Sequence, residues 1–170
     1  MAVDISPDTI AKVDTFLTRY RVKQGALLPI LHAIQDDQGQ LTLESIAWAA
    51  EKCGVSAATA YGVATFYPMF RLEPTGRYHI QVCATVPCAL CGGRELIDAL
   101  EKKLGVSVGE TTPDGKYTLG KCECLAACHE APAVHVNKKV YRYVTADKID
   151  EFLAAIESDD KGAFGRRTQR

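Results

Sequence analysis

Six of the seven cysteines of this 170-residue chain lie between residues 83 and 128. The total is odd, and the N-terminus lacks the basic region and apolar run of an export signal, so a disulfide framework is a poor interpretation. Thiols that cluster in a reducing compartment instead indicate metal or redox chemistry. This stretch therefore constrains the chain more than any other.

Two cysteine pairs follow predicted strands. Cys83 and Cys88 follow the alternating residues 78–82, and Cys124 and Cys128 follow a later segment of strand character. A [2Fe–2S] cluster needs four thiolates, two for each iron. We expect each pair in a loop just beyond its strand, where backbone amides can donate hydrogen bonds to sulfur. The small residues that would allow close approach are Gly92, Gly93, Ala126 and Ala127.

Structural zinc is an alternative for the same four cysteines. Zinc also takes four thiolates, and its cysteine pairs commonly enclose two to four residues. Both pairs here fall within that range. Spacing alone therefore leaves zinc and an iron–sulfur cluster open.

The other cysteines offer further interpretations. Cys91 forms a Cys-x-x-Cys motif with Cys88 at a strand-to-helix turn, which is typical of a thiol-disulfide oxidoreductase. Cys122 forms Cys-x-Cys with Cys124, so spacing leaves these two in competition, with a core-facing strand position as the alternative for Cys122. Cys53 lies on an apolar helix face, where burial is the default.

The rest of the sequence predicts helices followed by a sheet. Apolar residues recur at helical spacing from a cap at Ser6 to about Tyr67, with further helix starts at Thr42 and Ser56 and stops at Gly39 and Gly54. One of these helices is expected over about residues 25–38. Pro74 and Gly76 then mark a turn. The predicted strands beyond it are residues 78–82, 117–122, 133–136 and 140–143, and the predicted helices are residues 95–104 and a last segment capped by Thr145.

We therefore predict an α+β fold in which an N-terminal helical bundle precedes a thioredoxin-like α/β domain with a small mixed sheet. The bundle covers residues 1–73, and the second domain covers residues 74–157. Residues 158–170 carry charges and glycine and are expected to form a loose tail.

Composition narrows the possible partners. The 20 basic and 21 acidic residues give a net charge of −1, which provides no electrostatic footprint for nucleic acid or an anionic membrane. No uninterrupted apolar stretch approaches the roughly 18 residues of a membrane span. We expect a soluble, cytoplasmic protein that reaches a membrane only through its partners.

A helix-turn-helix is the remaining alternative. Residues 50–61 resemble this motif, with Gly54 in the turn, and a DNA-binding redox sensor would fit it. The second helix of the motif would cover residues 57–66, which contain no Lys or Arg. This composition argues against phosphate contacts.

Several stretches resemble one family, the thioredoxin-like [2Fe–2S] subunit of NADH-dehydrogenase modules, which is the small peripheral-arm subunit of respiratory complex I. The matching stretches are residues 61–67 (YGVATFY), 74–78 (PTGRY), 82–88 (VCATVPC), 108–115 (VGETTPDG) and 123–132 (ECLAACHEAP). The resemblance implies a [2Fe–2S] cluster rather than zinc. It implies the ligands Cys83, Cys88, Cys124 and Cys128, and so selects Cys124 over Cys122.

The chain departs from the family pattern at two positions. Ala126 stands where relatives usually have glycine, and Cys91 stands where they often have a basic residue. If the backbone at position 126 needs a positive φ, alanine there carries a strain of roughly 1–2 kcal/mol. Neither departure removes a predicted ligand.

The resemblance also implies partners. FMN and NAD(H) are expected on an NADH-oxidising flavoprotein subunit, because this chain has no Gly-x-Gly-x-x-Gly motif. The cluster would exchange single electrons with that FMN, and further iron–sulfur subunits would complete the complex. No independent active site is expected on this chain. The same role occurs in NAD-linked hydrogenases, formate dehydrogenases and electron-bifurcating complexes.

Several side chains near these motifs have two interpretations each. The helical part is expected to dock the flavoprotein partner, and its aromatic residues either contact that partner or pack in the helical core. Two cations near the cluster would raise its reduction potential, although such residues are more often plain surface charges. His129 is expected to be a loop residue rather than a ligand. The aromatic residues are Tyr61, Phe66, Tyr67 and Phe70, and the cations are Lys121 and Arg94.

Overall fold

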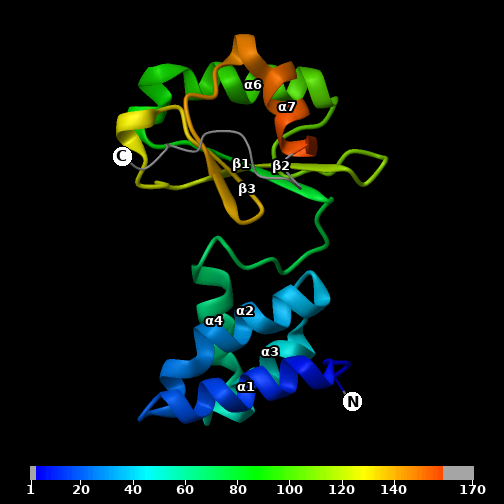
Figure 1. Cartoon of the computed structure of the whole chain (residues 1–170), viewed down its shortest axis with the longest axis vertical. Coiled ribbons are helices and arrows are strands. Elements are labelled where there is room, and N and C mark those ends of the chain that lie inside the picture. Colours follow the sequence, from blue (N-terminus) through cyan, green and yellow to red (C-terminus); the bar gives the residue numbers. More distant parts are fainter. Residues whose placement is uncertain (1–2, 159–170) are drawn as a thin grey trace. The chain divides into compact units, whose positions relative to one another are not determined.

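A computed structural model describes residues 3–158 of the chain (Figure 1). The chain divides into two compact units between Pro74 and Thr75, and each is described by itself. Apart from Ser158, which ends the last helix, the predicted tail lies outside the described residues. No helix of the described part is long and apolar enough to cross a membrane.

The first unit is helical because its sequence supplies caps and breaks in the right places. The hydroxyl groups of Ser6, Thr42 and Ser56 each accept a hydrogen bond from a first-turn amide of the following helix. Gly39 and Gly54 end two helices in the left-handed conformation. The helices are α1 (Pro7–Arg19), α2 (Leu27–Gln38), α3 (Leu43–Cys53) and α4 (Ala57–Phe66).

Two details of this unit differ from the sequence-based expectation or refine it. A 3-10 turn, Lys23–Ala26, precedes α2, where one continuous helix from about Gly25 was predicted. The aromatic residues divide between the two interpretations, because Phe70 is buried in the helical core whereas Phe66 is 77% exposed. Tyr61 is also exposed, and Tyr67 packs partly buried against the core.

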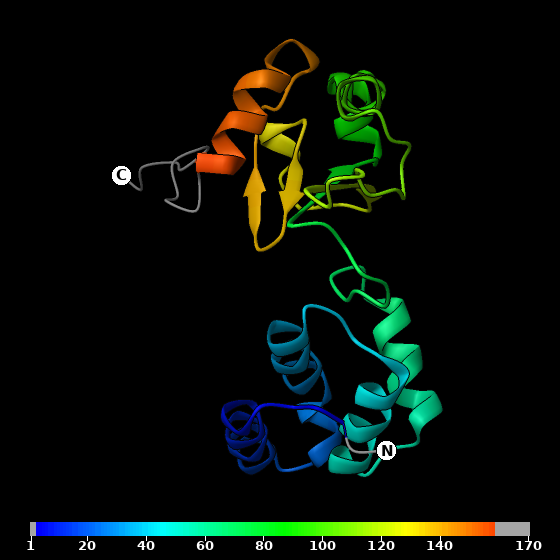
Figure 2. The same ribbon diagram turned by 90° about the vertical axis from the view of Figure 1, so that its right-hand side faces the viewer.

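The second unit holds a four-stranded mixed sheet, as predicted. Its strand order is β2-β1-β3-β4, with β1 and β2 parallel and the other pairs antiparallel. Helices α6 (Arg94–Leu104) and α7 (Ile149–Ser158) lie together on one side of the sheet (Figures 1 and 2). The strands are β1 (Tyr78–Cys83), β2 (Tyr117–Cys122), β3 (Val134–Val136) and β4 (Lys139–Tyr141).

Alternation along the strands builds the core between the sheet and these helices. Inward-facing residues of all four strands pack against the apolar faces of α6 and α7. The fully buried members of this core include Ile80, Val82, Leu96, Leu100, Leu119, Val134 and Phe152. The core therefore fixes where β1 and β2 end, and both strands end on a cysteine.

Three local predictions for this unit are wrong. Residues 86–93 are helical rather than part of a loop, since a turn α5 (Val86–Cys88) and a π-helical turn (Ala89–Gly93) lead directly into α6. The last strand stops at Tyr141, before Arg142 and Tyr143. A 3-10 turn (Ala146–Lys148) precedes α7, and the Thr145 side chain makes no capping hydrogen bond.

Candidate functional site

The first cysteine pair stands on regular structure. Cys83 is the last residue of β1 and Cys88 the last residue of α5, and both are buried. The amide of Cys83 donates to the carbonyl oxygen of Ala133 at 3.0 Å, which ties this strand end to the segment before β3. A Cβ atom added to Gly93 would lie 2.7 Å from the carbonyl oxygen of Cys88. Glycine at position 93 therefore permits the close packing that holds Cys88 in place.

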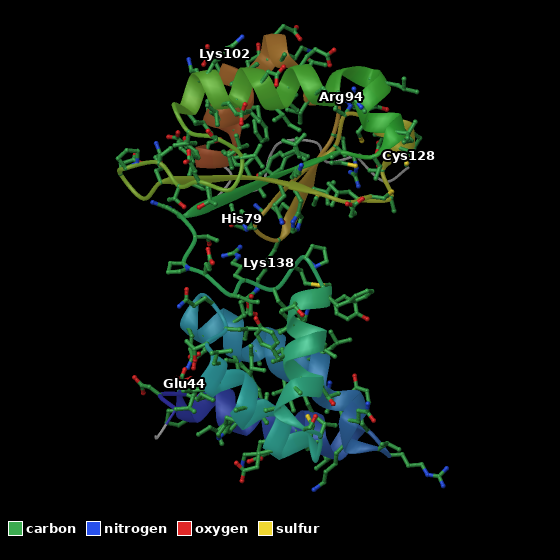
Figure 3. All side chains as sticks on the ribbon, turned by 180° about the vertical axis from the view of Figure 1, so that it is seen from behind. Glu44, His79, Arg94, Lys102, Cys128 and Lys138 are labelled. Carbon is green, nitrogen blue, oxygen red and sulfur yellow. The ribbon has the colours of Figure 1, made fainter. Side chains whose placement is uncertain are left out.

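The second pair stands on the loop of residues 123–133. Cys124 and Cys128 are both exposed, and Cys128 begins a 3-10 turn, Cys128–Glu130. Between them Ala126 has a φ of 55°, so the left-handed backbone considered from the sequence is present and alanine is strained there. In Figure 3, Cys128 lies toward the Arg94 end of α6 and away from Lys102.

The four thiols of the predicted ligands lie close enough to influence one another's pKa values. Hydrogen bonding with Cys124, burial and the nearby thiols of Cys124 and Cys83 raise the pKa of the Cys128 thiol. Burial, together with contact with Cys83 and the charge of Cys128, raises the pKa of the Cys88 thiol. Each thiol therefore interacts with its own partner, and Cys128 interacts with both members of the first pair.

Hydrogen-bond donors surround these sulfur atoms. Burial alone would raise the pKa of the Cys83 thiol, but hydrogen bonds from Thr85 and from the amide of Leu125 lower the pKa overall. The Thr85 hydroxyl lies 3.2 Å from the Cys83 sulfur.

Two more backbone amides point at sulfur atoms. The amide of Ala126 donates to the Cys124 sulfur at 3.3 Å, and the amide of Ala133 donates to the sulfur of Cys88. Donors of this kind stabilise negative charge on sulfur. A group with a net negative charge and four thiolate ligands fits this surrounding.

Among the remaining cysteines, Cys122 interacts with the predicted ligands. It is buried at the end of β2, with its sulfur 3.8 Å from the carbonyl oxygen of Gln81. Burial and the charges of Cys83, Glu123, Cys88 and Cys124 raise the pKa of the Cys122 thiol to about 12. Cys91 is exposed at a break in the helical backbone, and Cys53 is buried in the helical core, where burial raises its pKa.

Within residues 3–158, no group of three or more Cys, His, Asp or Glu side chains is arranged to hold a single metal ion. The four predicted ligands would supply the four thiolates of a [2Fe–2S] cluster, two for each iron.

Charged groups beside the second pair include residues that the sequence did not single out. The His129 ring is exposed, and its Nε2 lies 3.4 Å from a carboxylate oxygen of Glu130. Arg142 contacts the same carboxylate from the end of β4. Thr85 was detectable in principle as a hydroxyl residue two positions after Cys83, whereas no local signal connects Glu130 with Arg142. Lys121 and Arg94 are exposed, and a role for them in tuning the potential stays a prediction.

The fold and the thiol site together define a small iron–sulfur protein of the thioredoxin-like class. The family of thioredoxin-like [2Fe–2S] ferredoxins matches residues 13–157, and the chain belongs to this family. The resemblance stated from the sequence is therefore confirmed.

Named relatives cover most of the chain. A component of the NADH-quinone oxidoreductase of Rickettsia conorii is 43% identical over 138 residues, which are 81% of this chain and 83% of the relative. A mitochondrial protein of Dictyostelium discoideum, NADH dehydrogenase (ubiquinone) flavoprotein 2, is 37% identical over 170 residues, 98% of this chain and 69% of the relative. Subunit 2 of the NADH-quinone oxidoreductase of Thermus thermophilus is 39% identical over 80% of this chain and 76% of its own length.

Solved structures show the same fold. The NAD+-reducing [NiFe]-hydrogenase in its H2-reduced state superposes with a TM-score of 0.68 at 23% identity, over 85% of this chain and 24% of the hydrogenase chain. The air-oxidised state gives a TM-score of 0.66 over 81% of this chain. At this identity the likeness concerns the fold.

Proposed function

We propose that Cys83, Cys88, Cys124 and Cys128 hold one [2Fe–2S] cluster and that the chain transfers single electrons within an NADH dehydrogenase. The observation that carries this proposal is that the four thiols interact with one another and accept hydrogen bonds from backbone amides. Membership of the [2Fe–2S] ferredoxin family supports the cluster type. The names of the relatives, at 37–43% identity, support a complex I-type NADH:quinone oxidoreductase as the parent.

The residues of this chain hold the cluster and set its surroundings. When bound, a [2Fe–2S] cluster takes up and releases one electron at a time. Burial of Cys83 and Cys88 keeps water from that half of the site, which disfavours additional negative charge. The amides of Leu125, Ala126 and Ala133 act in the opposite direction, because they stabilise negative charge on sulfur.

The catalytic chemistry belongs to another subunit in this proposal. FMN and NAD(H) lie on an NADH-oxidising flavoprotein partner, with which this chain exchanges electrons, and further iron–sulfur subunits follow. Residues 1–73 form the docking domain and residues 74–157 the cluster domain. The exposed side chains of Tyr61 and Phe66 on α4 supply apolar contact area for docking. The cytoplasmic location expected from reduced cysteines belongs to the same proposal, with the membrane reached only through the parent complex.

The first test is metal content with a substitution series. The full chain, purified anaerobically, should contain two irons and two sulfides and give an S = 1/2 EPR signal when reduced. Alanine at any one of the four ligand positions should abolish this signal, because alanine cannot ligate iron. Cys91→Ala and Cys122→Ala are the matched controls and should retain the cluster.

Several outcomes would contradict the proposal. Zinc without sulfide in the native chain would exclude the iron–sulfur assignment. Loss of the cluster in Cys122→Ala with retention in Cys124→Ala would reverse the choice between these residues. Thiol-disulfide activity that survives Cys124→Ala and is lost in Cys91→Ala would favour the dithiol alternative. NADH should reduce the chain only when the flavoprotein partner is added, and direct reduction by NADH would argue against that partner.

A further inference from the structure

Residues 142–144, the clamp segment, run alongside the loop that carries Cys124 and Cys128. This segment follows β4, and several interactions join it to residues 129–132. The Nε atom of Arg142 lies 2.7 Å from Oε2 of Glu130. The amide of Tyr143 donates to the carbonyl oxygen of Glu130 at 3.0 Å, and the Tyr143 hydroxyl donates to that of His129 at 3.3 Å. The amide of Val144 donates to the carbonyl oxygen of Pro132 at 3.1 Å.

The carboxylate of the ion pair at the centre of these contacts is largely shielded from water. The side chain of Glu130 is only 10% exposed and that of Arg142 is 33% exposed. The pair of Lys103 and Asp150, by contrast, has side chains that are 49% and 80% exposed. A buried carboxylate that loses its cation is strongly disfavoured, whereas a surface pair contributes little. The attachment of Glu130 to Arg142 is therefore worth more than a surface ion pair.

The backbone of the clamp segment is also strained. Tyr143 has a φ of 54°, in the left-handed region that a bulky residue rarely adopts. This conformation ends β4 and coincides with the bonds of the Tyr143 amide and hydroxyl to the loop. Strain that persists at one residue requires surrounding interactions that enforce it. Here those interactions are the contacts with residues 129–132.

Glu130 connects the clamp segment to a predicted ligand. It ends the 3-10 turn Cys128–Glu130, and its amide donates to the carbonyl oxygen of Ala127 at 2.9 Å. The position of the Glu130 side chain and the position of Cys128 are therefore set by one short turn. The ion pair that holds Glu130 against Arg142 therefore also restrains the position of Cys128.

We propose that Arg142 is a positioning residue that acts through Glu130 to fix Cys128 and the second half of the cluster site. This inference rests on the proposed ligand set. The first cysteine pair stands on a strand end and a helical turn, which hold it in addition to its contacts with Ala133. The second pair stands on a loop and needs an anchor from outside that loop.

The test compares cluster retention in variants of the full-length protein purified anaerobically with its cluster. Arg142→Met removes the cation, Arg142→Lys keeps it, and Lys103→Met is the control that breaks a surface ion pair. Loss of the visible absorption in the presence of an iron chelator gives the rate of cluster release. The EPR line width of the reduced protein reports the order of the ligand set, and amide hydrogen exchange of Glu130 and Tyr143 in the metal-free chain reports the clamp without the cluster.

We expect Arg142→Met to release the cluster about 10- to 100-fold faster, as second-sphere substitutions do, with a broader EPR signal and faster exchange of both amides. Arg142→Lys should restore most of the retention. Lys103→Met should stay within about twofold of the native rate. A native rate and line width in Arg142→Met, or equal loss in Lys103→Met, would overturn the proposal.

A second pair of variants keeps the test decisive if Arg142→Met does not fold. Glu130→Gln removes the charge that Arg142 contacts but keeps the shape of the side chain, and Tyr143→Phe removes only the hydroxyl bond to His129. Both variants should release the cluster faster than the native chain. A native rate of release in Glu130→Gln would overturn the proposal, whatever the rate in Tyr143→Phe. If the native chain itself holds no [2Fe–2S] cluster, the proposed ligand set fails instead. Amide hydrogen exchange of Glu130 and Tyr143 in the metal-free chain then still tests whether Arg142 holds residues 129–132 in place.

Discussion

Cys83 and Cys88 lie buried at a strand end and in a helical turn, whereas Cys124 and Cys128 lie exposed on a loop with a strained alanine. The first pair is held by the same packing that builds the second unit, since Gly93 lies against Cys88 where α6 begins. The second pair is held by hydrogen bonds within its loop and by contacts with residues 142–144.

This difference shows that two halves of one site can be stabilised in different ways, one by the packing of regular structure and the other by contacts of a loop. A change at the first pair must disturb the fold, because its cysteines lie within regular structure. A change at the second pair disturbs less regular structure, because its cysteines are exposed on a loop, and the loop packs on the first pair mainly through Ala127 and Ala133. In the proposed function, the second half is therefore the one at which cluster retention can be adjusted without loss of the fold.

The largest effect is expected from Gly93→Ala, which disturbs the first pair. The added Cβ would lie 2.7 Å from the carbonyl oxygen of Cys88 and 3.4 Å from that of Cys83, and backbone atoms cannot turn aside as a flexible side chain can. We expect a loss of about 1–3 kcal/mol in the free energy of unfolding, together with loss of the cluster. Chemical denaturation of the metal-free chain and iron analysis measure the two effects.

Gly62→Ala in α4 is the matched control for this substitution. An added Cβ at position 62 meets no atom within 4 Å, and the residue lies inside a helix. The same chemical change should therefore stabilise the chain, by about 0.5–1 kcal/mol, and leave the cluster in place. Equal effects of the two substitutions would show that Gly93 is not specifically required beside Cys88.

The sequence predicts the parts of the fold that depend on local signals. Hydroxyl residues at Ser6, Thr42 and Ser56 mark three helix starts, and alternation marks β1 to β4 to within a few residues. The cysteine pairs were likewise visible as two short-range motifs. Their assignment as ligands rather than Cys122 came from the resemblance, because spacing does not tell which sulfur turns toward the site.

Features that arise from contacts distant in sequence could not be predicted. Residues 83–93 carry Pro87 and two glycines, which favour a loop, but residues 86–93 form helical turns in which Gly93 packs closely against Cys88. Arg142 continues an apolar–polar alternation and so was assigned to a strand. Its partner Glu130 lies on the other side of a hairpin, and only the folded chain brings the two together.

A smaller effect, of opposite sign, is expected from Ala126→Gly in the second pair. Ala126 has a φ of 55°, and glycine removes that strain while it adds conformational entropy to the unfolded chain. The net gain should be about 0.5–1 kcal/mol in the free energy of unfolding, with slower release of the cluster. Denaturation and bleaching rates of the full chain measure it.

Ala127→Gly, one residue further along, separates strain from loop flexibility. Ala127 has a φ of −114°, outside the left-handed region, and its side chain is buried. Glycine there should destabilise the chain by about 1–2 kcal/mol, because the unfolded chain gains entropy and a buried methyl group is lost. Stabilisation by both glycines would mean that flexibility of the loop, and not relief of strain at position 126, favours the bound state.

The smallest effect should come from Thr85→Val, which removes a donor from the first pair without changing its shape. The Thr85 hydroxyl lies 3.2 Å from the Cys83 sulfur and makes no capping hydrogen bond to the following helical turn, so helix stability should be unaffected. Loss of one donor makes additional negative charge on the cluster less favourable. We expect the reduction potential to fall by about 20 mV, equivalent to about 0.5 kcal/mol for one electron, while Thr85→Ser keeps the native value. Redox titration followed by EPR gives both potentials, and a fall in Thr85→Ser as large as in Thr85→Val would assign the effect to packing rather than to the hydroxyl group.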